Sequence, residues 1–306
     1  MNSLLKIREW YAQMYSQYGV AIDTAIKFLG AFLSVIMINS SIGTMSILKN
    51  PAVILAVCVL CAVLPKSLMV LLLAVFIVAH IYAISLETAA FVLAVLLIMF
   101  MLYFRFSAGD SFVLILLPVL FLLKIPFIIP IALGLLATPF SMVSVAFGTI
   151  VYFIIDYIST NKADMMAVGT EGLSIMSDMA RKVFTNQSMY LIIIAFSVVI
   201  TTVYVIKKLS APYSWQIAVG AGIVTNLVIL IIGTIKFGVN DVFSMAAIIV
   251  GDIVSLLLGV LICFMVHNVD YTRTEHTQFE DDDYYYYVKV VPKLKSEGKG
   301  RKRRRR

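Results

Sequence analysis

The apolar runs of this chain are broken most sharply between Asp110 and Asp156, where two runs of about a dozen residues meet at Lys124-Ile125-Pro126. A plain membrane helix continues for about 20 apolar residues. Proline ends or kinks a helix because it lacks a backbone N–H donor. The sequence therefore predicts discontinuous helices over 111–138, with a cation at the break.

The composition places most of the chain in lipid. Hydrophobic residues make up 61% of the 306 positions and charged residues 13%, which is more apolar than a soluble domain of this length needs. Apolar runs lie at about 27–48, 51–64, 67–84, 89–104, 111–123, 126–138, 139–158, 189–206, 214–235 and 242–266. We therefore expect an all-α, polytopic membrane helix bundle of eight to ten segments, with short or broken helices at 51–84 and 111–138. The sequence leaves open whether 111–138 crosses as two thin spans or re-enters as a hairpin.

Three regions follow from the charge and polarity patterns. Residues 1–26 read as an amphipathic interfacial helix, 27–266 as the membrane domain and 267–306 as a cytoplasmic tail. The net charge is +7, of which the tail holds +4 (eleven Lys and Arg against seven Asp and Glu) and the rest +3. Excess basic residues mark the cytoplasmic side of membrane proteins, so the pattern favours that interpretation over nucleic-acid binding. It predicts a plasma (inner) membrane protein with both termini in the cytoplasm.

The tail has a strand-like part and a basic end. Residues 279–291 are rich in tyrosine and valine, as strands are. A strand with an unpaired edge predicts pairing with another subunit or a cytoplasmic partner, with Tyr284 and Tyr286 as contacts. The basic end, including Arg303 and Arg304, is expected to be disordered and to contact anionic lipid.

Ionisable groups inside apolar runs are the candidate solute-binding residues. A charge at the bilayer centre costs about 3 kcal/mol on insertion scales, so such groups face the bundle interior or find partners. Asp252 and Asn226 hold comparable depths in the last two runs, so we expect them to share a hydrogen bond between closely packed helices. Lys124 either pairs with Asp252, Asp110 or Asp156 inside the membrane or extends to the far headgroups.

The sequence gives no sign of enzymatic chemistry. Cys58, Cys61 and Cys263 all lie in apolar runs and read as buried thiols. No nucleophile–base spacing, phosphate-binding glycine loop or metal-ligand spacing is present. We expect no enzyme activity, no cofactor and no metal, and an ATP-driven role would need a separate ATPase subunit.

One stretch is similar to a known family. The segment from Pro126 to Pro139, PFIIPIALGLLATP, followed by Val145-Ala-Phe-Gly148, resembles the substrate-capture subunits of energy-coupling-factor vitamin transporters, and also some rod-shape membrane proteins. The similarity covers about 30 residues of apolar, glycine and proline type. Thr138 stands where that pattern usually has glycine, and the extra helices and tail have no counterpart. The resemblance implies solute capture and assigns no binding residue.

Two hypotheses result. The leading one is a membrane protein that binds or transports a small solute, by itself or as the membrane subunit of a larger transporter, using Asp252, Asn226, Lys124 and Asp110. The alternative is a membrane scaffold or assembly protein that recruits a cytoplasmic partner through its tail.

Overall fold

The computed structural model describes residues 2–106, 108–167, 172–237, 242–266, 269 and 273–293. Within these residues the chain forms eleven α-helices and one two-stranded sheet. The helices are α1 (Asn2–Ser41), α2 (Pro51–Val63), α3 (Lys66–Tyr82), α4 (Leu86–Phe106), α5 (Ser111–Leu122), α6 (Ile128–Leu136), α7 (Met142–Ala167), α8 (Gly172–Phe184), α9 (Gln187–Lys207), α10 (Ser214–Phe237) and α11 (Met245–Val266). The strands are β1 (Glu275–Glu280) and β2 (Tyr285–Val290).

Six of the described helical segments are long and apolar enough to cross a membrane. They are Leu5–Ser41, Leu86–Phe106, Pro139–Met166, Gln187–Lys207, Ser214–Lys236 and Met245–Val266. The chain is therefore an integral membrane protein, and the all-α prediction is confirmed for its membrane part. The predicted count of eight to ten membrane segments is not confirmed, because α2, α3 and α5 are apolar but shorter.

Local sequence signals explain where several helices begin. Asn50 caps α2: its Oδ1 accepts a hydrogen bond of 2.9 Å from the Ala52 N–H, and Pro51 occupies the first turn. Asn186 caps α9 in the same way, with its Oδ1 3.1 Å from the Met189 nitrogen. An asparagine cap satisfies backbone donors that a helix start leaves free, and proline tolerates the first turn because its missing N–H is not needed there.

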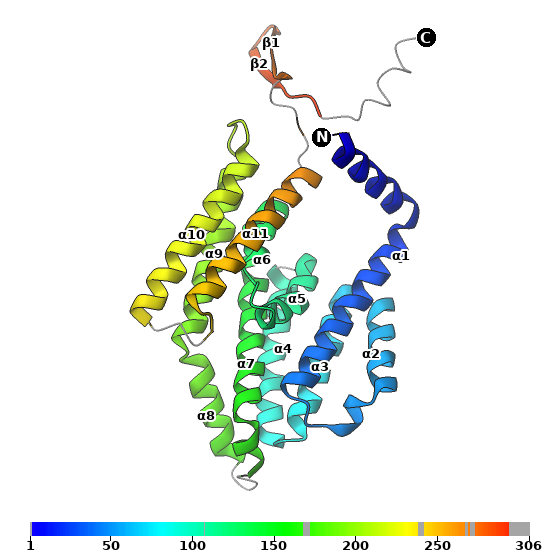
Figure 1. Ribbon diagram of the computed structural model, residues 1–306, viewed down its shortest axis with the longest axis vertical. Helices are drawn as coiled ribbons and strands as arrows, with labels where there is room; N and C mark the ends of the chain where they lie inside the picture. Colours follow the sequence, from blue (N-terminus) through cyan, green and yellow to red (C-terminus); the bar gives the residue numbers. More distant parts are fainter. Residues whose placement is uncertain are drawn as a thin grey trace.

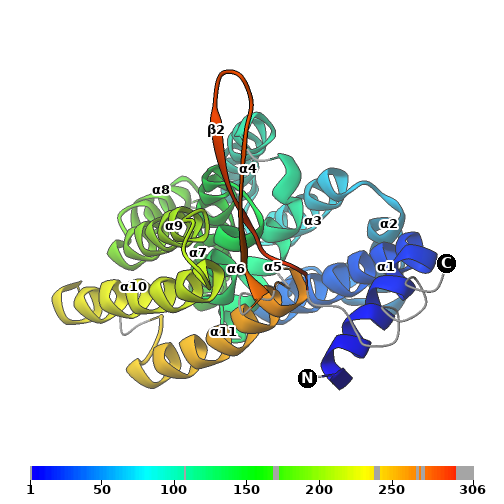
Figure 2. The same ribbon diagram turned by 90° about the horizontal axis from the view of Figure 1, so that it is seen from above.

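The helices pack as two groups joined in the middle. α1, α2, α3, α4, α5 and α7 pack on one another, and α6, α9, α10 and α11 form the second group. The large apolar core extends through both groups, and a second, smaller core lies within α6, α9, α10 and α11. Seen from above, α9 and α10 lie on one side and α1, α2 and α3 on the other, with α5, α6 and α7 between them (Figure 2). The two groups meet where α7 packs on α9 and where the rings of Phe121, Phe127, Phe196 and Phe243 contact one another.

α1 consists of two helical parts joined across a kink at Tyr18, which has non-helical backbone angles (φ −121°, ψ 22°). The segment before the kink reaches α11, since Arg8 Nε donates a hydrogen bond of 2.9 Å to the Met265 carbonyl. The beginning of α1 and the end of α11 therefore lie at the same end of the molecule (Figure 1).

A small charge network ties the α2–α3 turn to α1. Asp23 pairs with Lys66 (3.0 Å) and with Lys27 (3.5 Å). Lys27 also donates to the Leu64 carbonyl at 3.2 Å. The short helices α2 and α3 are thereby fixed to the long helix beside them.

The predicted break in 111–138 is present. α5 has 12 residues and α6 has nine, so at about 1.5 Å per residue each is far shorter than a hydrocarbon core of about 30 Å. Lys124 has a positive φ of 60° at the turn, and its N–H and that of Ile125 bond back to Phe121 and Leu120. Neither helix can cross a bilayer alone.

Helices continue beyond the predicted apolar run 139–158. α7 extends to Ala167, and α8 follows and packs on α4 and α7.

The tail differs from the prediction of one strand over 279–291. The structure instead has two antiparallel strands, with Glu275 opposite Val290 and Glu280 opposite Tyr285. Asp281 causes the division: its Oδ1 accepts from the backbone N–H groups of Asp283 (3.0 Å) and Tyr284 (2.7 Å). Aspartate favours such turns because its short side chain can bond to the backbone two residues on.

Candidate functional site

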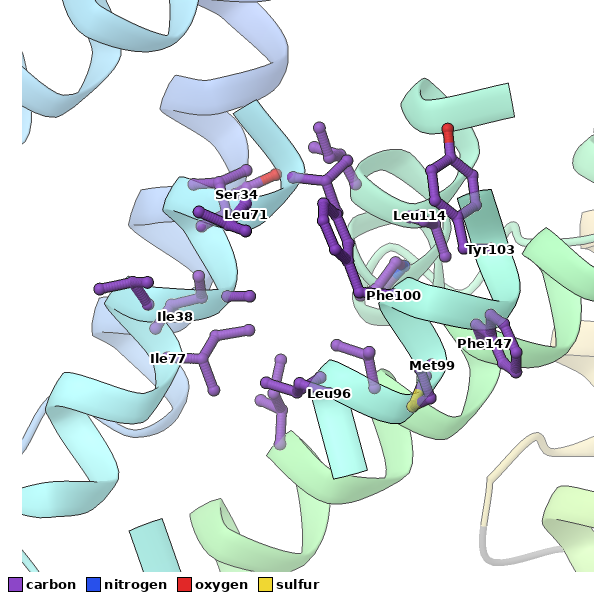
Figure 3. A pocket seen from close by; sticks show the side chains of 18 of the residues that line it. Ser34, Ile38, Leu71, Ile77, Leu96, Met99, Phe100, Tyr103, Leu114 and Phe147 are labelled. Carbon is purple, nitrogen blue, oxygen red and sulfur yellow. The ribbon is translucent and has the colours of Figure 1, made fainter. Parts of the chain in front are cut away.

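A cavity of about 160 Å³ lies among α1, α3, α4, α5 and α7. Ser34, Ile38, Leu71 and Ile77 face Leu96 and Phe100 across its centre (Figure 3). The wall is almost wholly apolar, and hydroxyl groups reach it only through Ser34 and Tyr103. An apolar cavity of about 150 Å³ stays dry and binds small apolar molecules in a well-studied engineered protein.

Close helix contacts shape the inner wall. α5 carries Leu114, Ile115 and Pro118 into the cavity and packs on α7. At Gly148 of α7 an added Cβ would meet the Leu117 side chain at 3.0 Å, so a larger residue there would push α5 away. Glycine at this position therefore lets the short helix sit close enough to close the cavity from behind.

The outer side of the cavity lies at the surface of the bundle. Four lining residues are substantially exposed: Leu71 and Val75 of α3, and Leu93 and Leu97 of α4. These apolar side chains belong to the surface that meets lipid in a membrane protein. The cavity is therefore bordered by lipid-facing residues between α3 and α4.

The polar groups of the wall already have partners. Ser34 Oγ donates to the Gly30 carbonyl at 2.9 Å, as serine commonly does within a helix. The Tyr103 and Ser111 hydroxyls lie 2.5 Å apart and share a hydrogen bond. A polar solute would find few free groups here, because buried hydrogen-bonding groups must be matched on both sides. The cavity suits an apolar molecule.

The predicted site residues lie elsewhere. Asp252 of α11 and Asn226 of α10 are buried together in the second helix group, and Asn226 Nδ2 donates to Asp252 Oδ1 at 2.8 Å. The predicted hydrogen bond between these helices is therefore confirmed. Neither residue borders the cavity.

Lys124 extends outwards from the break instead of binding an acid in the bundle. Its Nζ donates to the Val242 carbonyl at 2.9 Å and lies 5.6 Å from the centre of the Phe243 ring. A pairing with Asp252 is not found, since the Asp252 carboxyl bonds Asn226. Among the three acids proposed as partners, Asp156 is close enough for the Lys124 charge to act on it. The two side chains form no ion pair among the described residues. The Lys124 side chain is exposed, and its extension to the far headgroups stays a prediction.

Asp110 precedes α5 and is separate from Asp252. It occupies the cap position of α5, but its side chain makes no cap hydrogen bond to the helix. Its charge acts on Tyr103 at the end of α4. The structure thus brings Asp252 and Asn226 together and leaves Lys124 and Asp110 at other places.

The contacts of the tail with a partner or with lipid stay predictions. Tyr286 stacks on Phe279 (ring centres 4.9 Å apart) and donates to Asp281 Oδ2 at 2.8 Å, so its hydroxyl serves the hairpin itself. Tyr284 is exposed. Arg303 and Arg304 lie outside the described residues.

The sequence did not indicate the cavity. Its lining comes from α3, α4 and their neighbours, in which residues facing lipid and residues facing the cavity are equally apolar. Hydrophobic periodicity distinguishes faces only where polar and apolar residues alternate, so it gives no signal here. Pro118 within α5 is the one local irregularity that marks the region.

Comparison with known proteins adds no identification: no family model, curated protein or solved structure matches the chain.

Proposed function

We propose that this membrane protein binds a small, largely apolar molecule, with the hydrocarbon chain of a membrane lipid or similar amphiphile as the occupant of its cavity. The observation that carries the proposal is the apolar cavity bordered by lipid-facing residues. Pockets for whole drug-sized ligands usually measure about 300–1,000 Å³. At about 160 Å³, this cavity fits a segment of a hydrocarbon chain rather than a large polar solute.

The surroundings of the cavity are consistent with an amphiphile. Its apolar wall ends at Tyr103, close to the hydroxyl of Ser111 and the charge of Asp110. Arg105 follows on the same helix. A hydrocarbon chain lying in the cavity would thus have polar and charged residues of the protein near one of its ends, where a headgroup is expected. Binding of such a molecule would be the first step of a transport or capture function.

We also propose that the protein lies in the plasma (inner) membrane, with the end where α1 begins and α11 ends in the cytoplasm. The beginning of α1 and the end of α11 share that end, and the basic tail follows α11. Lys66, Arg105 and Lys207 lie at or next to helix ends, and we place these ends on the same side. The positive-inside rule supports this orientation.

The experiment is photolabelling of the protein in vesicles that contain a phospholipid with a photoreactive group in its acyl chain. We expect adducts concentrated on the cavity-lining parts of α3, α4 and α5. Ala74→Phe fills the cavity, because Ala74 lines it. This variant should lower labelling there about tenfold, equivalent to about 1.4 kcal/mol of binding free energy.

Ala56→Phe is the matched control, since Ala56 is exposed on α2 and does not line the cavity. It should label like the wild type. Adducts spread evenly over the lipid-facing surface, or equal labelling of all three proteins, would overturn the proposal.

A second candidate function, docking of a cytoplasmic partner or an ATPase subunit, is favoured by the hairpin. All residues of β1 and β2 are exposed, and the hairpin projects beyond the helices (Figure 1). A truncated protein that ends at Val266 separates the two candidates. Lipid binding predicts that the truncated protein is labelled like the wild type. Docking predicts that the truncation abolishes the protein's cellular role, which is measured in a separate assay in cells.

A further inference from the structure

The Asn226–Asp252 pair is an unusual arrangement for the interior of a membrane protein. The two side chains are only 1% and 2% exposed, and they face each other from α10 and α11 within helices that can span a bilayer. Asn226 Nδ2 donates to Asp252 Oδ1 at 2.8 Å. Each residue thus contributes one atom to the bond and has one oxygen left.

Those two remaining oxygens have no hydrogen-bond partner among the described residues. They are Asn226 Oδ1 and Asp252 Oδ2, and both are buried. Two acceptors facing a dry interior are unfavourable, because an ionised carboxylate only accepts hydrogen bonds. A proton on Asp252 Oδ2 changes this: the carboxylic acid becomes a donor, and the free amide oxygen is the acceptor that it needs.

No cation is available to neutralise Asp252 among the described residues. α11 packs on α10 and α6, and α6 contains no ionisable residue. On α10, Lys236 lies in the last turn, well beyond Asn226. Lys124, whose carbonyl lies near Gly251, directs its ammonium to Val242 instead.

The remaining neighbours of Asp252 on α11 are already engaged. Ser255 Oγ donates to the Gly251 carbonyl at 2.7 Å, and the Cys263 thiol lies near the Trp215 carbonyl further along the helix. Asn226 is accordingly the one side chain that bonds the carboxyl, and no charged group of the described chain acts on it.

We propose that Asp252 is a proton-binding site, in which the protonated carboxyl and the Asn226 amide form a reciprocal pair of hydrogen bonds between α10 and α11. The ligand is a proton, held at Oδ2. The site lies in the second helix group, away from the cavity, so it goes beyond the proposed lipid binding. A change in the proton occupancy of this pair would change the hydrogen bonding that holds α10 and α11 together.

Asp252→Asn tests the proposal directly. An amide at position 252 can donate to Asn226 Oδ1 and accept from Asn226 Nδ2, as the protonated acid would. We therefore expect the thermal unfolding temperature of the variant in detergent to match the wild type at about pH 5. Asn226→Leu removes both bonds and should lower it by at least about 2–4 °C.

The proposal also predicts the direction in which stability changes with pH. If folded Asp252 retains its proton while the unfolded chain releases it, the unfolded state binds fewer protons, and stability falls as pH rises. The wild type should therefore lose stability relative to Asp252→Asn as pH rises from about pH 5, with Na⁺ or choline as the counter-ion giving the same result.

Infrared difference spectroscopy of wild type minus Asp252→Asn provides a second measurement. The wild type should show the carbonyl stretching band of a protonated carboxylic acid at about pH 5. Absence of that band, or a wild type that is stabilised by Na⁺ when the variant is not, would overturn the proposal. The lipid-labelling result is independent, because Asp252 does not line the cavity.

Discussion

Gly134 shows how one residue sets the distance between two helices. A Cβ added there would lie 2.6 Å from the Val203 side chain and 3.1 Å from the Ile200 carbonyl of α9. Contacts this short cannot be accommodated without moving backbone. Small residues at helix contacts are typical of membrane bundles, where close packing replaces the hydrophobic drive of water.

We predict that Gly134→Ala destabilises the protein by about 1–3 kcal/mol, the usual cost of overpacking. Gly220→Ala is the matched control, because nothing lies within 4 Å of its added Cβ. In a helix it should be neutral or stabilising by up to about 1 kcal/mol. Denaturant unfolding in detergent measures both, and equal effects of the two substitutions would show that α6 does not pack on α9 in this way.

At this scale the sequence predicts some residues well and others poorly. Asp252 and Asn226 could be paired in advance, because polar groups in a membrane need partners and these two hold similar depths in adjacent runs. Lys124 could not be placed, because its direction depends on a left-handed turn and on where Val242 lies, more than a hundred positions away. The conformation of this turn and the position of Val242 follow from tertiary structure rather than from a local sequence pattern.

The stability of the β1–β2 hairpin depends on a titratable group, Asp281. The Tyr286 hydroxyl and the backbone N–H groups of Asp283 and Tyr284 hold the pKa of Asp281 below its ordinary value. The same bond to Asp281 raises the pKa of Tyr286. Since the folded pKa of Asp281 is lowered, the stabilisation is present above the ordinary aspartate pKa of about 3.9. It is lost as pH falls through the lowered value.

We predict that Tyr286→Phe moves the pKa of Asp281 upwards, because it removes the first of these donors. Tyr284→Phe leaves the hydroxyl of Tyr286 in place and should not move it. Carbon-detected NMR titration of the Asp281 carboxyl in the full-length protein measures the shift. An Asp281 pKa that is the same in Tyr286→Phe as in the wild type would contradict this account of the turn.

Helices were easier to predict than the tail. The apolar run predicted at about 51–64 agrees with α2, which the structure starts at Pro51 behind the Asn50 cap. The strand-like composition of 279–291 was also informative, but it did not reveal the hairpin. Its turn depends on one of three consecutive aspartates accepting two backbone bonds, and composition does not distinguish Asp281 from its neighbours.

For the whole molecule, membrane insertion was predictable and the cavity was not. Apolar composition is sufficient for the first, as the six candidate spans show. The cavity requires knowing how α1, α3, α4, α5 and α7 are placed around it, a three-dimensional property that no local pattern records. The two notable features also involve different helices, because the cavity is lined by these five and the Asn226–Asp252 pair joins α10 and α11.

The most direct test of the central claim is native mass spectrometry of the protein released from mild detergent. We predict that the wild type and Ala56→Phe retain a tightly bound molecule with a hydrocarbon chain, and that Ala74→Phe retains several-fold less. A wild type that is free of bound lipid under conditions in which it remains folded, or equal retention by Ala74→Phe, would contradict the assignment of the cavity as a binding site.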